Sequence, residues 1–199
     1  LNLCTFLKSI DWGANWTLQA NGWYQSNDPA RNDGGARIAV TGANPNRIYV
    51  YLIGESKAND HGFISIYRSD NAGATWINAY GQDGGPYSAS HPNLAIGWDN
   101  WLYHQGFYNC AILANPNNAD EILIGGLNLY RSTDGGASYT SVSGYVGGPL
   151  SLHVDNQDFR QVNGVTWITT DGGIYKSNDF LSTQPDFSTS GVHASDFWG

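Results

Sequence analysis

The sequence predicts an all-β fold, and three observations lead to that class. Residues that fill the exposed faces of helices are scarce, because the 199 residues include 3 Lys, 2 Glu and no Met. The chain instead holds 25 Gly, which suit tight turns, and 12 Tyr and 8 Trp, which favour strands. In addition, a short turn-like motif recurs along the chain. We therefore expect many short strands joined by tight turns.

Composition also excludes several classes of protein. The net charge is −8 and the pI about 4.7, so the chain lacks the basic surface of a nucleic-acid-binding protein. No apolar run approaches the roughly 20 residues that cross a bilayer. Two cysteines, Cys4 and Cys110, cannot form a disulfide framework, and we expect both to be free thiols.

The recurrent motif occurs in full at 9–16, 69–76 and 132–139, and a shorter fourth copy begins at Ser177 without the Gly and the final aromatic residue. Its Asp or Asn oxygen can accept hydrogen bonds from backbone N–H groups further along, and its Gly adopts a positive φ easily. Each copy is therefore predicted to be a hairpin turn. The residues assigned to this structural role are Ser9, Asp11, Gly13, Trp16, Ser69, Asn71, Gly73, Trp76, Ser132, Asp134, Gly136 and Tyr139.

A second repeated element precedes the turns. Residues 38–50 and 111–124 both consist of a β-like run, an Asn-Pro turn and another β-like run. Together with a following hairpin, each element makes a unit of four antiparallel strands. Units of this kind are the blades of a β-propeller.

The motif S-x-D-x-G-x-T-W resembles the Asp-box, or BNR repeat, of sialidases, sortilin-type receptors and xyloglucanase-like glycoside hydrolases. Residues 125–136, 153–159 and 170–177 are most similar to the sortilin and xyloglucanase side of that group. The resemblance implies a β-propeller in which the Asp-box is a structural turn, away from the face that binds ligands.

The repeats also predict where the blades lie. Residues 1–20 would form the end of one blade, 36–80, 105–142 and 150–182 three full blades, and 191–199 the start of another. Because a propeller needs about four to eight blades to close, we expect an incomplete segment of a larger propeller. A small ring of four blades is the alternative.

Candidate catalytic residues gather in the last third of the chain. His153, Asp155 and Asp158 form an H-x-D-x-x-D cluster, in which positions 153 and 155 would share one face of a strand. Asp171 would complete a pair with Asp155 or Asp158, as glycoside hydrolysis requires. The alternative is a plain turn at Asp171-Gly172-Gly173, since the same tripeptide recurs at 33–35, 83–85 and 134–136.

Exposed aromatic side chains suggest a ligand-binding loop within 81–109. Aromatic faces stack on sugar rings and anchor protein partners, and loops usually carry binding residues. The alternative is that these side chains fill the space between blades. With His153, the candidate ligand-binding residues are Trp98, Trp101, Tyr103, Phe107 and Tyr108.

Two functions remain open at this point. The favoured one is an extracellular or cell-surface module that recognises a glycan or a protein; the alternative is a xyloglucanase-like glycoside hydrolase using paired Asp carboxylates. A sialidase, which binds its substrate carboxylate with several arginines, is disfavoured, because two of the six Arg residues, Arg68 and Arg131, occupy equivalent positions beside the repeated motif and are expected to be structural. We expect no cofactor and no metal, and neither nucleic-acid binding nor membrane insertion. The remaining partners would be further blades of the same or another chain.

Overall fold

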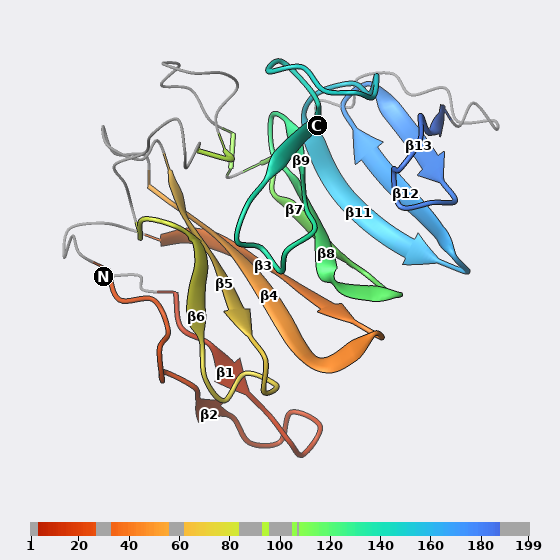
Figure 1. Ribbon diagram of the computed structural model, residues 1–199. Helices are drawn as coiled ribbons and strands as arrows, with labels where there is room; N and C mark the ends of the chain where they lie inside the picture. The colour runs from red at the N-terminus through yellow and green to blue at the C-terminus, as the bar shows by residue number, and fades with distance from the viewer. Residues whose placement is uncertain are drawn as a thin grey trace.

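The computed structural model describes residues 4–26, 33–55, 62–83, 93–95, 105–106 and 108–187. This part of the chain is all-β, and its strands form one two-stranded sheet and three four-stranded antiparallel sheets (Figure 1). No helix long and apolar enough to cross a membrane occurs among these residues. The all-β prediction is confirmed.

Each sheet is a continuous stretch of the chain, with its strands hydrogen-bonded in sequence order. The first sheet contains β1 (Leu7–Lys8) and β2 (Thr17–Leu18). The second contains β3 (Asp33–Thr41), β4 (Asn44–Gly54), β5 (Phe63–Ser69) and β6 (Ile77–Gly81). The third contains β7 (Ala111–Asn115), β8 (Asn118–Gly125), β9 (Leu129–Ser132) and β10 (Thr140–Ser143). The fourth contains β11 (Asn156–Val162), β12 (Val165–Thr170), β13 (Gly173–Ser177) and β14 (Asp186–Phe187).

The sheets stand side by side in chain order, as the blades of a β-propeller do (Figure 1). The first strands of the three larger sheets are neighbours, because β7 contacts both β3 and β11. These three strands therefore lie innermost, and the later strands of each sheet lie further out. The predicted fold class, four-stranded antiparallel blades in a β-propeller arrangement, is confirmed.

The core lies between the sheets, and strand β4 shows why. Successive side chains of a strand point to opposite faces. Tyr49, Tyr51 and Ile53 join the cluster shared with the third sheet, whereas Val50 and Leu52 join the cluster that includes the segments flanking the first sheet. All five side chains are at most 1% exposed. An inner blade needs this pattern because both of its faces are covered.

Four turns with one hydrogen-bond pattern connect the last two strands of each sheet. We call them the repeat turns and count positions from their first Ser, so that Ser9, Ser69, Ser132 and Ser177 are position 0. In each turn the Ser Oγ donates to the Asp or Asn oxygen at position +2 (2.8–3.0 Å) and accepts the N–H of position +4 (2.7–2.9 Å). The oxygen at +2 also accepts a backbone N–H from further along the turn.

The fourth repeat turn forms without Gly. Positions +3 and +4 have a positive φ in all four turns, and in the fourth they are Phe180 (φ 56) and Leu181 (φ 62). This backbone conformation is costly for a residue with a Cβ. Both side chains are at most 6% exposed and pack in the cluster with Leu129 and Val142 of the third sheet, which offsets that cost. The missing aromatic is replaced by Gln184, whose amide bonds both N and O of Ser151.

A basic side chain directly before each of the first three repeat turns connects its sheet to the next sheet. The acceptor is always the main-chain carbonyl at position +3 of the following repeat turn, and we call this hydrogen bond the inter-sheet link. The three links are Lys8 Nζ to Ala72 O (2.7 Å), Arg68 Nη1 to Gly135 O (2.9 Å) and Arg131 Nη2 to Phe180 O.

The aromatic side chain at position +7 packs back onto the preceding sheet. Trp76 is 4% exposed and lies edge-on to Phe6 and Trp23, with ring centroids 4.5 and 4.8 Å away. Tyr139 packs in the same way on Tyr80 of β6, at 4.9 Å. Each turn thereby contributes apolar contact as well as a hydrogen bond to the joint between sheets.

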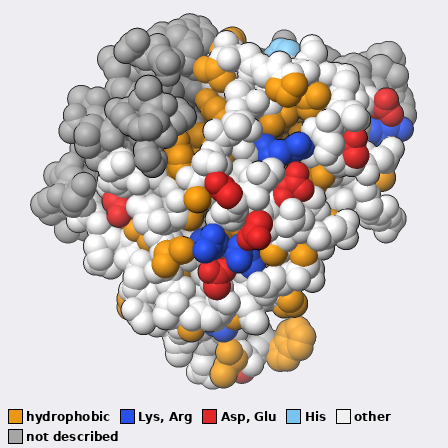
Figure 2. Space-filling view, viewed as in Figure 1, with side chains coloured by type: hydrophobic (Ala, Val, Ile, Leu, Met, Phe, Trp, Pro, Cys, Tyr) orange, Lys and Arg blue, Asp and Glu red, His pale blue; other side chains and the backbone are white. Residues whose placement is uncertain are grey.

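Ion pairs add to the joint between the second and third sheets. Arg47 pairs with Asp70 and with Asp120, the latter at 2.8 Å, and Arg68 pairs with Asp70 at 3.2 Å. Figure 2 shows basic and acidic side chains gathered on this part of the surface. This end of the molecule is therefore occupied by structural contacts.

Candidate functional site

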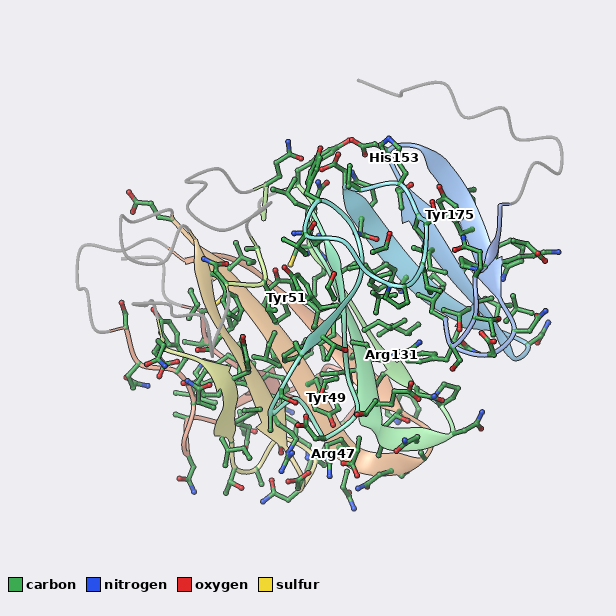
Figure 3. All side chains as sticks on the ribbon, turned by 45° about the horizontal axis from the view of Figure 1, so that its top comes forward. Arg47, Tyr49, Tyr51, Arg131, His153 and Tyr175 are labelled. Carbon is green, nitrogen blue, oxygen red and sulfur yellow. The ribbon has the colours of Figure 1, made fainter. Side chains whose placement is uncertain are left out.

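The candidate site lies at the end of the sheets opposite the repeat turns. In the fourth sheet the β13–β14 connection is a repeat turn, so the β12–β13 turn and the start of β11 are at the other end. Figure 3 shows His153 and Arg47 at opposite ends of the molecule. Arg47 marks the end with the repeat turns, because it pairs with Asp70 at position +1 of the second one.

Two of the three predicted carboxylates meet at this end. The Asp171 N–H donates to the carbonyl of Asp155 at 3.2 Å, which fixes the β12–β13 turn against the segment before β11. Asp158 is not part of the pair. Its carboxylate forms an ion pair with Arg160 at 2.8 Å; the Arg160 side chain is largely exposed and that of Asp158 is about half exposed.

Two side-chain amides hold the carboxylates in place. Asn109, just before β7, donates through Nδ2 to Asp155 Oδ1 at 3.0 Å. Gln157 donates through Nε2 to Asp171 Oδ1 at 2.5 Å and to Asn109 Oδ1 at 2.7 Å. One network therefore joins the third and fourth sheets. We call Asp155, Asp171, Asn109 and Gln157 the carboxylate site.

The backbone at the site is unusual. Asp155 has φ 64, a conformation that few residues other than Gly adopt. Backbone hydrogen bonds maintain it, because the Asp155 N–H donates to Leu127 O at 3.2 Å and the Asn156 N–H to Gly126 O at 2.9 Å. Strain held in this way occurs often at functional sites.

Two further side chains border the carboxylate site. The His153 ring is packed on the turn beside Asp171, so closely that a Cβ on Gly172 would lie 2.3 Å from its Cγ. The His153 N–H donates to the hydroxyl of Tyr175 at 2.9 Å, and Figure 3 shows both residues at this end. Tyr145, after β10, is 49% exposed, and its pKa is raised first by partial burial and then by the charges of Asp155 and Asp171.

The carboxyl group of Asp155 holds its proton more tightly than a free aspartic acid. Burial is the main cause, since it disfavours the charged form, and the neighbouring charge of Asp171 raises the pKa of Asp155 further. His153 and the hydrogen bond from Asn109 act in the opposite direction. The site therefore combines two carboxylates, of which at least Asp155 is a weaker acid than usual.

A cavity of about 370 Å³ adjoins the site between the innermost strands. Arg37 and Ile38 of β3, Ile112 of β7, and four consecutive residues of β11, 157–160, line it. Gln157 thus belongs to the cavity wall and to the carboxylate site together. Asp158 lies in this cavity.

Most of the predicted aromatic residues fall outside the described part of the chain. Trp98, Trp101, Tyr103 and Phe107 are among them. Tyr108 is described and is 42% exposed, with its N–H donating to Gln105 O at 2.7 Å. Both cysteines are free thiols, as predicted, and Cys110 is buried. Within the described residues, no group of three or more His, Cys, Asp or Glu side chains has the arrangement of a metal site.

The tripeptide Asp-Gly-Gly has more than one structure. Asp171 and Gly172 form a two-residue turn between the paired Thr170 and Gly173, as predicted. Residues 134–136 lie in a repeat turn. The turn prediction is wrong at 33–35, which begins strand β3, because a bulge absorbs the extra residue there. At 83–85, only the Asp lies in the described part of the chain.

Sequence reasoning missed the two amides and Tyr145. Gln157 could have been found, because residues two apart on a strand share a face and Asp155 had been singled out. Asn109 and Tyr145 carried no such signal, since packing between sheets brings them to the site.

No family model and no curated protein matches the sequence. Among solved structures, the chain is similar to an ancestral GH74 enzyme at 16% identity and a TM-score of 0.49, over 87% of this chain and 20% of that one. It is also similar to YCF48 bound to D1 peptide, at 16% identity and a TM-score of 0.42, over 78% and 40% of the two chains. A third similar structure is the GH74 xyloglucanase from Xanthomonas campestris, at 17% identity and a TM-score of 0.33, over 76% and 25%. The chain thus spans less than half the length of each of these proteins.

Proposed function

We propose that this chain belongs to an Asp-box β-propeller that recognises a glycan at the carboxylate site, outside the cell or on its surface. The observation that carries the proposal is the pair Asp155 and Asp171, held by amides from two sheets at the end that the repeat turns leave clear. Within the described residues, only one oxygen of each carboxylate accepts a side-chain hydrogen bond. Among the described residues, the other oxygen of each accepts no side-chain hydrogen bond, and we propose that it accepts bonds from the ligand.

The chemistry of the site suits a neutral polyhydroxylated ligand. Carboxylate oxygens accept hydrogen bonds from hydroxyl groups, and amides can donate as well as accept. Tyr145 supplies an exposed aromatic face beside them, on which a sugar ring can stack. Two acidic side chains disfavour phosphate, sulfate and sialic acid as ligands, because like charges repel.

The test measures binding to a glycan array, followed by calorimetry on the best ligand. Asp171→Asn keeps the shape of the side chain and removes its charge, so we expect roughly tenfold weaker binding or more, the usual loss for a hydrogen bond to a charged group. Asp158→Asn is the matched control, since it removes a carboxylate of the same sheet that stands outside the pair. Equal affinity in Asp171→Asn and the wild type would contradict the proposal.

A protein ligand that presents Lys or Arg would use the same carboxylates. Salt separates the two classes of ligand, because an ion pair at a half-exposed site weakens with ionic strength whereas neutral hydrogen bonds do not. Glycan binding that is insensitive to salt supports the proposal. Binding confined to cationic peptides and lost at high salt would replace it.

One observation favours glycoside hydrolysis as a second candidate function. A hydrolase needs a carboxyl that stays protonated, to act as the acid, beside an ionised one. The raised pKa of Asp155 next to Asp171 fits that division, with Asp155 as acid and Asp171 as base or nucleophile. Turnover of β-glucans that disappears in Asp171→Asn and persists in Asp158→Asn would support hydrolysis. Binding without any turnover would leave the recognition module as the function.

A further inference from the structure

The two amides of the carboxylate site form a hydrogen-bonded chain that has a direction. Gln157 Nε2 carries two hydrogens and uses both, one on Asp171 Oδ1 at 2.5 Å and one on Asn109 Oδ1 at 2.7 Å. Asn109 Nδ2 also uses both of its hydrogens, on Asp155 Oδ1 at 3.0 Å and on Gln105 Oε1 at 2.8 Å. The chain therefore donates to one carboxyl oxygen at each of its ends.

This orientation of the amides satisfies every contact without a proton on either carboxyl group. If the Asn109 amide alone were turned over, its Nδ2 would face Gln157 Nε2, and two donors would meet. If both amides were turned over, their oxygens would face Oδ1 of Asp155 and Oδ1 of Asp171, and each carboxyl would need a proton on that atom. The amides thus keep Oδ1 of both carboxyl groups as an acceptor.

The backbone places both amides for this role. The register of β11 shifts between Asn156 and Asp158, so Gln157 is the extra residue of a bulge. A bulge re-aims a side chain, and bulges are frequent beside functional sites. Asn109 is 1% exposed, and a buried amide that lost its partners would be costly. The chain of amides is therefore kept together by burial as well as by its own bonds.

We propose that Asn109 and Gln157 are positioning residues, which reserve Oδ1 of both carboxyl groups so that Asp155 gains and loses its proton at Oδ2, the atom that meets the ligand. Above the titration midpoint of Asp155 this atom accepts a hydrogen bond, and below the midpoint it donates one. A hydroxyl group can both donate and accept, so it suits either state, whereas an ammonium group can only donate. The inference rests on the proposed function and deepens it, because it names the hydroxyl as the group that the site recognises.

The surroundings of Asp155 determine how its titration reports on the chain. Within the described residues, the titratable groups that act on it or lie beside it are Asp171, His153 and Tyr145. Burial and then the charge of Asp171 raise the pKa of Asp155, whereas His153 and the hydrogen bond from Asn109 lower it. Loss of the Asn109 bond should therefore raise this pKa further.

The first test needs no ligand. The side-chain carboxyl carbon of Asp155 is followed by NMR across pH in the wild type, Asn109→Leu, Gln157→Glu and the double variant. Asn109→Leu removes the donor to the ionised carboxyl, so the midpoint should rise by about one pH unit, which corresponds to one hydrogen bond to a charged group. An unchanged midpoint would overturn the proposal.

Gln157→Glu tests whether position 157 acts through Asn109. The change replaces a donor by an acceptor, so the Asn109 amide should turn over, present its oxygen to Asp155 and raise the midpoint. The added charge alone would raise the midpoint equally with or without Asn109, and the double variant separates the two causes. A smaller rise in the Asn109→Leu background supports the chain, and an equal or larger rise would overturn it.

Two further variants serve as controls. Gln161→Glu makes the same change on the same strand, where Thr166 Oγ1 donates to the side-chain oxygen at 2.6 Å and needs only an acceptor. The Asp155 midpoint should stay at its wild-type value in this variant. Asn109→Ser also lacks the amide and replaces Asn109→Leu if that variant disturbs the fold, which circular dichroism checks.

The second test measures the affinity of a neutral β-glucan oligosaccharide by calorimetry above and below the Asp155 midpoint. Because Oδ2 can donate once it is protonated, we expect binding below the midpoint to be at least as tight as above it. Binding that weakens tenfold or more as Asp155 takes up its proton would overturn the assignment of Oδ2. Absence of glycan binding at every pH would contradict the proposed function, whereas the NMR titrations would still decide between the presence and absence of the amide chain.

Discussion

Replacing Gly73 with Ala should destabilise the protein through two separable effects. Gly73 has φ 86, and an Ala there carries roughly 1–2 kcal/mol of backbone strain, of which about 0.4–1 is offset because Ala restricts the unfolded chain. The new Cβ would also lie 3.0 Å from Cε1 of Phe6. That ring is held between Trp23 and Trp76, so we add about 1–3 kcal/mol for overpacking.

Gly164 is the matched control because it isolates the backbone effect. It has φ 81 in the two-residue turn between β11 and β12, and a Cβ there would meet nothing within 4 Å. We expect Gly164→Ala to lower the free energy of unfolding by about 1 kcal/mol and Gly73→Ala by about 2–4 kcal/mol. At about 2–4 °C per kcal/mol, the two melting temperatures should differ clearly.

Urea unfolding and calorimetry measure both losses, and the difference between them measures the contact with Phe6. Adding Phe6→Leu to each variant closes a double-mutant cycle in which only Gly73→Ala should couple to position 6. Equal losses in the two Ala variants, with no coupling, would refute the packing of the first sheet on the second repeat turn. The absence of any loss would refute the positive φ itself.

Three further outcomes are expected. Ser132→Ala removes the hydroxyl that donates to the +2 carboxylate and accepts the +4 N–H, so urea unfolding should show a loss of about 1–3 kcal/mol. Hydrogen bonds lower the pKa of Asp11 to about 2, so its contribution to stability is complete above the unfolded value near 3.8 and is lost as the pH falls towards 2; NMR titration of its carboxyl should give the low midpoint, and a midpoint near 3.8 would contradict the turn. The contribution of Asp155 to stability depends on pH in the opposite direction. Its pKa is raised in the folded state, so stability is lost as the pH rises through that raised value. Asp155→Asn should therefore melt above the wild type at pH 7 and match it in acid, where both side chains are neutral, and a constant difference across pH would refute the assignment.

The fold could be predicted from the sequence because its signals are local. A repeat turn such as 69–76 contains all of its own hydrogen-bond donors and acceptors, so spacing alone identifies it. The fourth turn was only partly recognised. Its Phe180 and Leu181 lack the Gly signature, and the cost of their backbone is offset by burial against another sheet, which no local pattern reports.

The candidate site was less accessible to sequence reasoning because it is assembled between sheets. Asp155 and Asp171 could be singled out by residue type, but their pairing depends on a main-chain bond across 16 residues of chain. Asp158 was equally plausible by spacing, and a bulge between Asn156 and Asp158 changes which residues of β11 face the site. Asn109 comes from the segment before the third sheet.

The inter-sheet link does not depend on the side chain of the residue that accepts the hydrogen bond. Ala72, Gly135 and Phe180 serve equally well as acceptors, since every residue carries a main-chain carbonyl. Only the donor must be basic, and it belongs to the other sheet. Such a joint tolerates duplication and recombination of whole sheets, because a transplanted unit brings a donor for its new neighbour and offers an acceptor without any matching substitution. Residues at the opposite end, which carries the carboxylate site, can then change in one sheet at a time while the inter-sheet links stay the same.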